Sequence, residues 1–223
     1  YYLFALPALL LAMYAQYRVR SAYSKYLKVR NRRNMTGREA AQRLLRMNGL
    51  QDIEVRETQG RLSDHYDPRN KTLSLSRSVS RSPSLASLAI VAHETGHAVQ
   101  DHRDYMPLRL RSGLVPVVQL GSWLGPIIFL AGMFLPIKNL SFIGLLLFSG
   151  TLVFSLVTLP VEFDASRRAV AMLREGQLIT SEEVEGARNV LSAAALTYVA
   201  AAAQAISTIL YYMFLLGGFR RRD

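Results

Sequence analysis

Residues 93–97 of the chain read His-Glu-Thr-Gly-His, a spacing that suits metal binding. Two histidines four residues apart on a helix project from the same face, one turn apart. Both imidazoles can therefore reach one Zn²⁺ ion, and Glu94 between them is long enough to contact a water at that ion as a general base. The pattern predicts His93 and His97 as metal ligands and hydrolysis as the chemistry.

A helix must carry this pattern, and the surrounding residues predict one. Ser82-Pro83 supplies a capping side chain followed by a proline at the first helical position, where the missing N–H has no cost. Residues 85–99 contain no proline and carry aliphatic side chains nearly all round, as a buried helix does. Gly96 lowers helix propensity by about 1 kcal/mol relative to alanine. We therefore expect it to serve close approach of the helix backbone to a substrate or a neighbouring strand.

The composition points to a membrane protein. Half of the 223 residues are hydrophobic although 43 are charged, which suggests that charged and apolar residues are segregated along the chain. Cysteine is absent, which excludes disulfides and thiolate ligands and leaves histidine, carboxylate or water for any metal. Uncharged apolar runs of about the length needed to span a bilayer occupy residues 1–17, 113–135, 139–159 and 196–216. Since the first run is short and no initial methionine precedes it, we expect a truncated span there.

Basic residues set the predicted topology. Residues 18–33 hold seven arginines and lysines directly after the first span, and the positive-inside rule places such a segment in the cytoplasm. We expect these charges to contact anionic lipid headgroups rather than nucleic acid. The basic tail, with Arg220–Arg222, then falls on the opposite side, against the rule. The predicted segments are a transmembrane helix at 1–17, a cytoplasmic domain at 18–112, a transmembrane hairpin at 113–159, cytoplasmic helices at 160–195, a transmembrane helix at 196–216 and the tail at 217–223.

A zinc site of two histidines needs a third ligand on the same side of the membrane. His102 lies only five residues after His97 and would require the helix to end at once. Glu162 is the better candidate, because the hairpin returns it to the side of the histidines and Pro160 is expected to interrupt the apolar helix just before it. It would complete a site with one position open for water. Asp164 is the alternative ligand.

Several strings resemble one known family. They are HETGHAVQD at 93–101, LPVEFDASRRA at 159–169, ARNVLSAAALTYVAAA at 187–202, and LSDHYDP at 62–68. The chain resembles the YugP-like neutral zinc metallopeptidases, bacterial membrane proteins of about this length, and more distantly the HtpX and CAAX-prenyl-protease peptidases. The resemblance implies that His93 and His97 bind zinc, that Glu94 is the base and that Glu162 is the third ligand.

Other residues are candidates for supporting roles. In the broader glutamate-zincin pattern an aspartate follows the ligand glutamate by four residues and orients a histidine, but here that place is Ser166. Asp101 or Asp164 could accept the hydrogen bond from a ligand imidazole instead. His65 is a candidate for stabilising an oxyanion. Tyr198 could face the site or anchor the last helix at the membrane interface.

The region before the zinc helix predicts a small α+β unit. Thr36 and Glu39 form a capping box, and the helix that they start is expected to stop at Asn48-Gly49. Alternating residues predict strands at 52–58 and 72–76. By analogy with the zincins that the chain resembles, we expect them to form a short antiparallel sheet. We expect the second strand to be an exposed edge that binds an extended peptide through main-chain hydrogen bonds. Its residues are Thr72, Leu73, Ser74, Leu75 and Ser76.

Together these features predict a mainly α membrane protein with about four transmembrane helices and a small α+β zincin-like catalytic domain on the cytoplasmic side. We expect a multi-pass protein of the inner membrane with Zn²⁺ as cofactor. The predicted activity is endopeptidase hydrolysis of a peptide or membrane-protein substrate by zinc-activated water. We expect the protein to contact the lipid bilayer and not to bind nucleic acid. Association with other membrane proteins or with further copies of itself stays open. A zinc-binding scaffold or pseudoprotease without activity is the alternative, and a non-peptidase hydrolase acting on lipid also stays open. No span carries an interior charge, which disfavours a transporter or channel.

Overall fold

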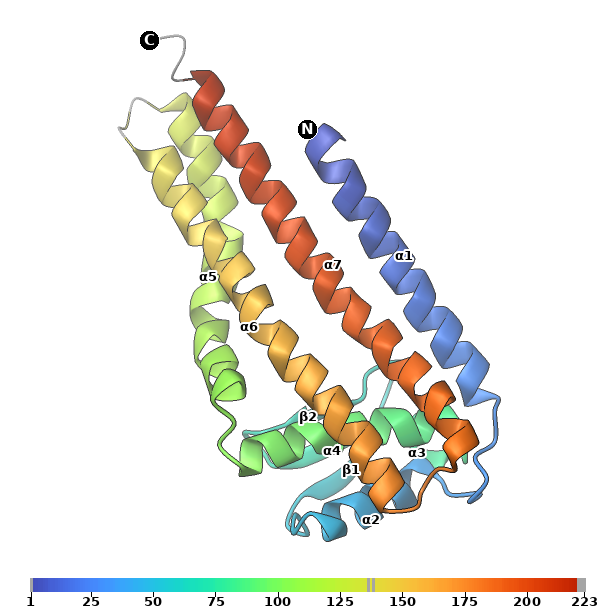
Figure 1. Ribbon diagram of the computed structural model, residues 1–223. Coiled ribbons are helices and arrows are strands. Elements are labelled where there is room, and N and C mark those ends of the chain that lie inside the picture. The colour runs from blue at the N-terminus through green and yellow to red at the C-terminus, as the bar shows by residue number, and fades with distance from the viewer. Residues whose placement is uncertain (1, 136, 138, 220–223) are drawn as a thin grey trace. The chain divides into compact units, whose positions relative to one another are not determined.

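The computed structural model describes residues 2–135, 137 and 139–219, and this part of the chain is mostly helical (Figure 1). Its elements are α1 (Tyr2–Leu27), α2 (Gly37–Met47), β1 (Glu54–Thr58), β2 (His65–Asp67), β3 (Thr72–Ser76), α3 (Arg77–Arg81), α4 (Leu85–His102), α5 (Met106–Phe134), α6 (Leu140–Glu175) and α7 (Ser181–Phe219). They form two compact units. The first comprises the described residues of 1–15, 109–160 and 196–223, and the second comprises 16–108 and 161–195. Lys138 and Arg220–Arg222, used in the predicted topology, lie outside the described residues.

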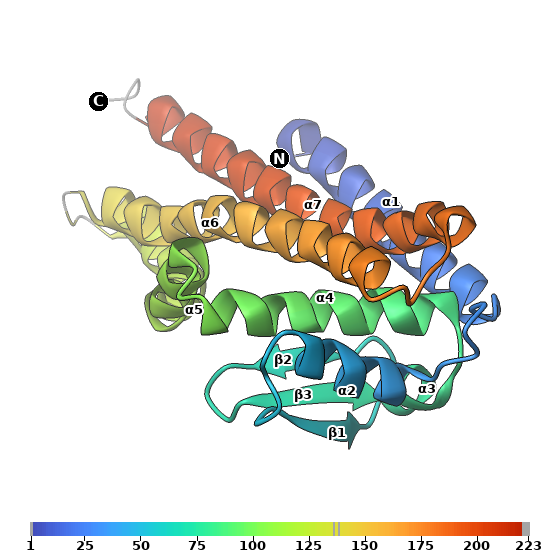
Figure 2. The same ribbon diagram turned by 60° about the horizontal axis from the view of Figure 1, so that its bottom comes forward.

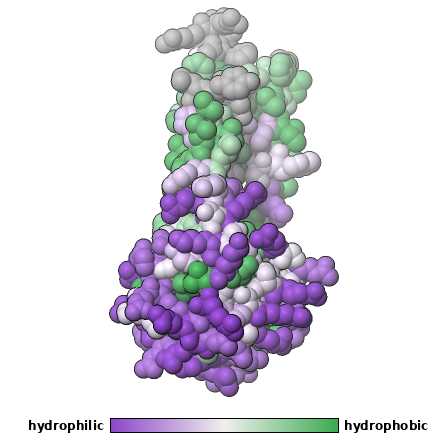
Figure 3. All heavy atoms as spheres, turned by 90° about the vertical axis from the view of Figure 1, so that its right-hand side faces the viewer, coloured by the Kyte–Doolittle hydropathy of each residue, from purple (hydrophilic) through white to green (hydrophobic). Residues whose placement is uncertain are grey.

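The first unit consists of apolar helical segments. Among the described residues, α5, α6 and α7 are long and apolar enough to cross a membrane. Residues 2–17 of the remaining predicted span, at 1–17, lie in α1, and its crossing of the membrane stays a prediction. Large apolar side chains such as Trp123 are exposed on these helices, and Figure 3 shows apolar groups gathered over this unit. A Cβ added at Gly144 of α6 would collide with the backbone of Phe129, so glycine lets α5 and α6 pack closely.

The second unit packs helices against a three-stranded sheet (Figure 2). Helix α2 begins with the predicted capping box, which is confirmed: Thr36 accepts from the Glu39 backbone, and the Glu39 side chain accepts from the Thr36 N–H. Its buried residues recur at the spacing of one helix face. They pack with β3 and α4 in a core whose fully buried members include Leu44, Leu73 and Leu88.

The helix predicted at 85–99 is confirmed as α4, but its cap differs from the prediction. Ser82 ends α3, and the chain stays extended through Ser84, which pairs with Arg30 in an isolated bridge. Ser84 is the N-cap, and its side chain accepts from the Ser87 N–H at 3.1 Å. The Ser82-Pro83 prediction was wrong because the pairing with Arg30 holds two more residues out of the helix.

The sheet corrects the predicted substrate edge. The strand order is β1-β3-β2, with β3 parallel to β1 and antiparallel to β2. Thr72–Ser76 is therefore the central strand, hydrogen-bonded on both sides, and the prediction of an exposed antiparallel edge there was wrong. The cause is β2, a strand of three residues that covers one side of β3. The edges of the sheet are β1 and β2.

Helix α6 also differs from the prediction, since Pro160 lies inside it rather than ending it. A proline in a helix removes one N–H from the hydrogen-bond ladder, and the helix persists where packing supports the turn. Val161 and Ala165, which follow Pro160, are both completely buried. One continuous helix therefore carries the apolar segment and the residues after it.

Candidate metal centre

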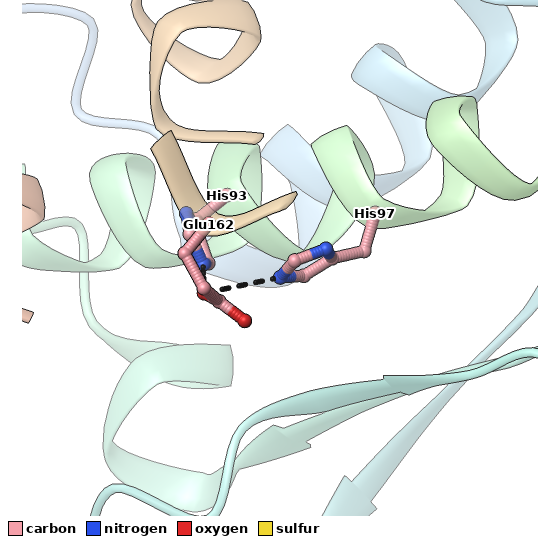
Figure 4. A group of neighbouring side chains, drawn as sticks. All are labelled: His93, His97 and Glu162. Atoms are coloured by element: carbon pink, nitrogen blue, oxygen red, sulfur yellow. Dashed lines mark hydrogen bonds and ion pairs between the residues drawn. The ribbon is translucent and has the colours of Figure 1, made fainter. Parts of the chain in front are cut away.

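His93, His97 and Glu162 come together in the second unit (Figure 4). The Glu162 Oε2 atom lies 3.2 Å from His93 Nε2 and 3.6 Å from His97 Nε2. The imidazole rings are 4.7 Å apart and nearly perpendicular, as expected for adjacent turns of α4. Two helices, α4 and α6, thus aim three potential ligands at one point.

This donor set fits a zinc ion. One potential ligand atom from each residue lies within 4.8 Å of the others. The side chains of His93 and His97 are 13% and 12% exposed and that of Glu162 only 2%, so the cluster is largely shielded from solvent. Histidine nitrogen and carboxylate oxygen are common ligands of Zn²⁺, and three protein ligands with one open position are typical of catalytic sites.

Gly96 lets the two ligand helices approach each other. A Cβ added there would lie 2.8 Å from the backbone oxygen of Ala165 and 3.2 Å from its Cα. Any side chain at this position would therefore collide with the backbone of α6, one turn after Glu162. The expected close approach is real, but its partner is this helix rather than a substrate or a strand.

Glu94 is held beside the cluster by the edge strand of the sheet. Its Oε2 accepts a hydrogen bond from the backbone N–H of Tyr66 in β2 at 3.0 Å. Burial raises the pKa of Glu94 and the charge of Glu162 adds to this, while the two histidines and the Tyr66 N–H act in the opposite direction. Glu94 is thus a partly buried carboxylate with a raised pKa that lies next to the metal-binding cluster without belonging to it.

The second nitrogen of each ligand histidine has its own partner. Ser166 Oγ lies 3.2 Å from His93 Nδ1, and Gln100 Oε1 lies 3.0 Å from His97 Nδ1. Burial disfavours the charged form of His97, but its bonds to Glu162 and Gln100 and the charge of Glu94 together raise its pKa. Each imidazole therefore has a polar neighbour at both nitrogens.

Asp101 and Asp164 have other partners among the described residues. Asp101 Oδ2 accepts from the Tyr66 hydroxyl at 2.7 Å and from Lys71 Nζ at 2.5 Å. Burial and the Asp101 carboxylate raise the pKa of Tyr66. Asp164 is bonded to Arg167 and Arg168, at 2.5 Å each, and to Gln100. The Nδ1 atoms of His93 and His97 thus contact Ser166 and Gln100 rather than these aspartates. Neither Asp164, the alternative ligand, nor His102 belongs to the metal-binding group found.

The remaining predicted residues lie elsewhere. His65 is exposed on β2, with Nδ1 2.9 Å from the Ser63 carbonyl oxygen, and Tyr198 belongs to the first unit. Their roles stay predictions. Sequence reasoning missed Tyr66 as the group that holds Glu94, and it missed Gln100. A signal for Gln100 existed, because a residue three positions after His97 shares its helix face.

Two comparisons with known proteins bear on this site. Residues 1–217 match the model of a family described as "Putative neutral zinc metallopeptidase". The chain is 42% identical over 214 residues to the "Putative membrane protease YugP" of Bacillus subtilis (strain 168), covering 96% of this chain and 95% of the relative. No solved structure matches the chain.

Proposed function

The chain belongs to the neutral zinc metallopeptidase family, and from this premise we propose that it is a membrane-integrated endopeptidase. The observation that carries the proposal is the buried cluster of His93, His97 and Glu162 with Glu94 beside it. A scaffold that used zinc only for structure would need no carboxylate held apart from the ligands by its own hydrogen bond.

The proposed mechanism follows from the position of each side chain. His93, His97 and Glu162 would hold Zn²⁺, which when bound supplies a Lewis acid that acidifies water and polarises a carbonyl. Glu94 takes the proton of the attacking water on its carboxylate and passes it to the leaving amine. The Tyr66 N–H fixes the carboxylate in place, and burial of the cluster excludes bulk water from the transfer.

The substitution Glu94→Gln tests the base. We expect peptide hydrolysis to fall by at least about 10²-fold, the lower range for general acid–base catalysis. Zinc content should be unchanged, because Glu94 is not a ligand. His93→Ala is the matched control and should lose zinc and activity together. Cleavage by Glu94→Gln at the wild-type rate would contradict the mechanism, and a zinc-loaded wild type without activity on any peptide would favour the scaffold.

The substrate strand is proposed to lie along β2. This strand is an edge of the sheet, and the backbone of Tyr66 already contacts Glu94. An extended peptide that pairs with β2 would therefore pass beside the proposed base. A photoreactive peptide bound to the Glu94→Gln variant should cross-link to residues 65–67. Labelling of β1, the other edge, would contradict this placement.

We further propose four spans in the inner membrane, with the metal centre on the cytoplasmic side. The seven basic residues at 18–33 support this orientation. The chain contains no cysteine, so single cysteines report on sidedness without background. In intact cells, Gln59→Cys should react only with a membrane-permeant maleimide and Ile137→Cys also with an impermeant one. The opposite pattern would reverse the topology.

A further inference from the structure

Gln100 lies next to the metal centre, and both the oxygen and the nitrogen of its side-chain amide make hydrogen bonds. It is completely buried in α4, three residues after His97. Its Oε1 lies 3.0 Å from His97 Nδ1. Its Nε2 donates to the Val161 carbonyl oxygen at 2.8 Å and to Asp164 Oδ2 at 2.9 Å. A fully buried amide with every bond made to a neighbouring helix or a ligand histidine has a defined orientation.

The hydrogen-bond chemistry fixes the direction of this amide. The Val161 carbonyl can only accept, and Asp164, bonded to two arginines, is an ionised carboxylate that also only accepts. The NH₂ group of Gln100 must therefore face α6, so its oxygen must face His97. An oxygen there requires His97 Nδ1 to carry the hydrogen. His97 Nε2, which faces Glu162, is then the nitrogen that remains to bind a metal.

The same side chain joins the helices that carry the ligands. Val161 directly precedes Glu162, and Gln100 bonds to its carbonyl oxygen from α4. The counterpart at the other histidine, Ser166, is a hydroxyl that can donate or accept at 3.2 Å and so does not fix the hydrogen on His93. Gln100 is thus the side chain that determines both the position and the proton of a ligand.

We propose that Gln100 is a positioning residue of the metal centre, which holds His97 with Nδ1 protonated and Nε2 directed at the metal and fastens it to the turn of α6 that bears Glu162. The proposal rests on the zinc centre of the proposed function. It assigns to a neutral amide the task that a carboxylate or a backbone carbonyl performs at most zinc-bound histidines.

Zinc affinity, measured in detergent by competition with a chromogenic chelator, tests this role without reference to activity. Gln100→Met keeps the length of the side chain and removes both polar ends, so we expect zinc affinity to fall about 10- to 100-fold. Gln100→Glu keeps an acceptor oxygen for His97, and its other oxygen, which faces the Val161 carbonyl and the Asp164 carboxylate, must carry a proton to replace the amide donor. In this form it should bind zinc at least about tenfold more tightly than the Met variant. Gln42→Met, on the exposed face of α2, is the matched control and should bind zinc as the wild type does. Thermal unfolding of the metal-free proteins reports separately on packing.

Rescue by Gln100→Glu, with both variants folded, supports the positioning role. Wild-type zinc affinity in Gln100→Met overturns it. Equal losses of affinity in the two variants, in proportion to their losses of stability, also overturn it and assign Gln100 to packing. The proposal is likewise overturned, and Gln100 is assigned to packing, if neither variant folds. A wild type that binds no zinc overturns the centre itself, and that result is visible before any Gln100 variant is made.

Discussion

The substitution Gly96→Ala adds one methyl group at the crossing of α4 and α6. Its Cβ would lie 2.8 Å from the Ala165 backbone oxygen, whereas ordinary contacts begin at 3.4 Å. The obstacle is backbone, so it cannot rotate away, and α6 must move by about 0.6 Å to restore an ordinary contact. Metal sites tolerate about 0.2 Å in ligand distance. The displaced helix carries Glu162, so the change should reach the metal.

Two energies oppose each other in this variant. Alanine gains about 1 kcal/mol of helix propensity over glycine, and overpacking typically costs about 1–3 kcal/mol. We therefore expect the metal-free protein to lose between about 0 and 2 kcal/mol of stability. Zinc affinity should fall by at least about tenfold, the scale seen when support of a metal ligand is lost. The large effect is on the metal rather than on the fold.

Calorimetric zinc titration and thermal unfolding in detergent measure the two effects. Gly113→Ala is the matched control: the position is helical, and an added Cβ would meet nothing within 4 Å. It should be neutral or stabilising and leave zinc binding unchanged. Ala165→Gly should not rescue Gly96→Ala, because the clash is with a carbonyl and not with the Ala165 side chain. If Gly96→Ala binds zinc as tightly as the wild type, the crossing does not set the ligand geometry and the reasoning is refuted.

Three further predictions follow from hydrogen bonds at and near the site. Ser166→Ala should weaken zinc binding by less than about tenfold, the lower end for such partners, and an effect larger than that of Gln100→Met in the same titration would reverse their order of importance. Tyr66→Phe removes a hydrogen bond to the charged Asp101 and should lower the free energy of unfolding by about 1.5 kcal/mol in chemical denaturation. Zinc affinity should be unchanged because the backbone N–H of residue 66 still bonds to Glu94, and a loss of zinc would contradict this. Thr36→Ala should cost about 1 kcal/mol. The Thr36 N–H and hydroxyl lower the pKa of Glu39 below 4.5 in the folded protein. Part of this stabilisation is therefore present above pH 4.5 and is lost as the pH falls through the lowered pKa. A stability deficit of Thr36→Ala relative to the wild type that grows in acid, measured by thermal unfolding, would contradict the capping box.

The features that could be predicted from the sequence depend on short spacings. The face shared by His93 and His97, the box of Thr36 and Glu39 and the extent of α4 each follow from a few consecutive residues. Glu162 lies 69 residues from His93, and it could be proposed on two grounds. The predicted hairpin crosses the membrane twice and so returns Glu162 to the side of the histidines, and the family resemblance of residues 159–169 implies it as a ligand. No local spacing connects the two segments.

The pairing of the strands could not be predicted, because the polar side chains of β3 suggest a solvent-exposed strand although β3 is buried. The alternation of apolar and hydroxyl residues suggests one solvated face, yet Thr72 and Ser76 are buried. Small hydroxyl groups can be buried when a partner satisfies them, and Ser76 donates its hydroxyl and its backbone N–H to the two carboxylate oxygens of Asp64. β2 has three residues and no periodicity of its own. A central strand therefore looked like an edge.

The role of Gln100 was missed for a related reason: its spacing from His97 is a local signal, but its other partners lie 61 and 64 residues away on α6. The supports of the metal centre converge on that stretch of α6. The Ala165 backbone sets the distance to α4 at Gly96. The other supports are the Val161 carbonyl and Asp164, which orient Gln100, and Ser166, which contacts His93. Residues 161–166 thus supply the proposed third ligand and the groups that contact the other two candidate ligands, directly or through Gln100. A His-Glu-Thr-Gly-His helix without this segment would still have two histidines on one face. It would lack a fixed distance to a neighbouring helix, a defined position for the hydrogen on His97, and a candidate third ligand. The unit on which metal binding depends is therefore the crossing of the two helices rather than the motif.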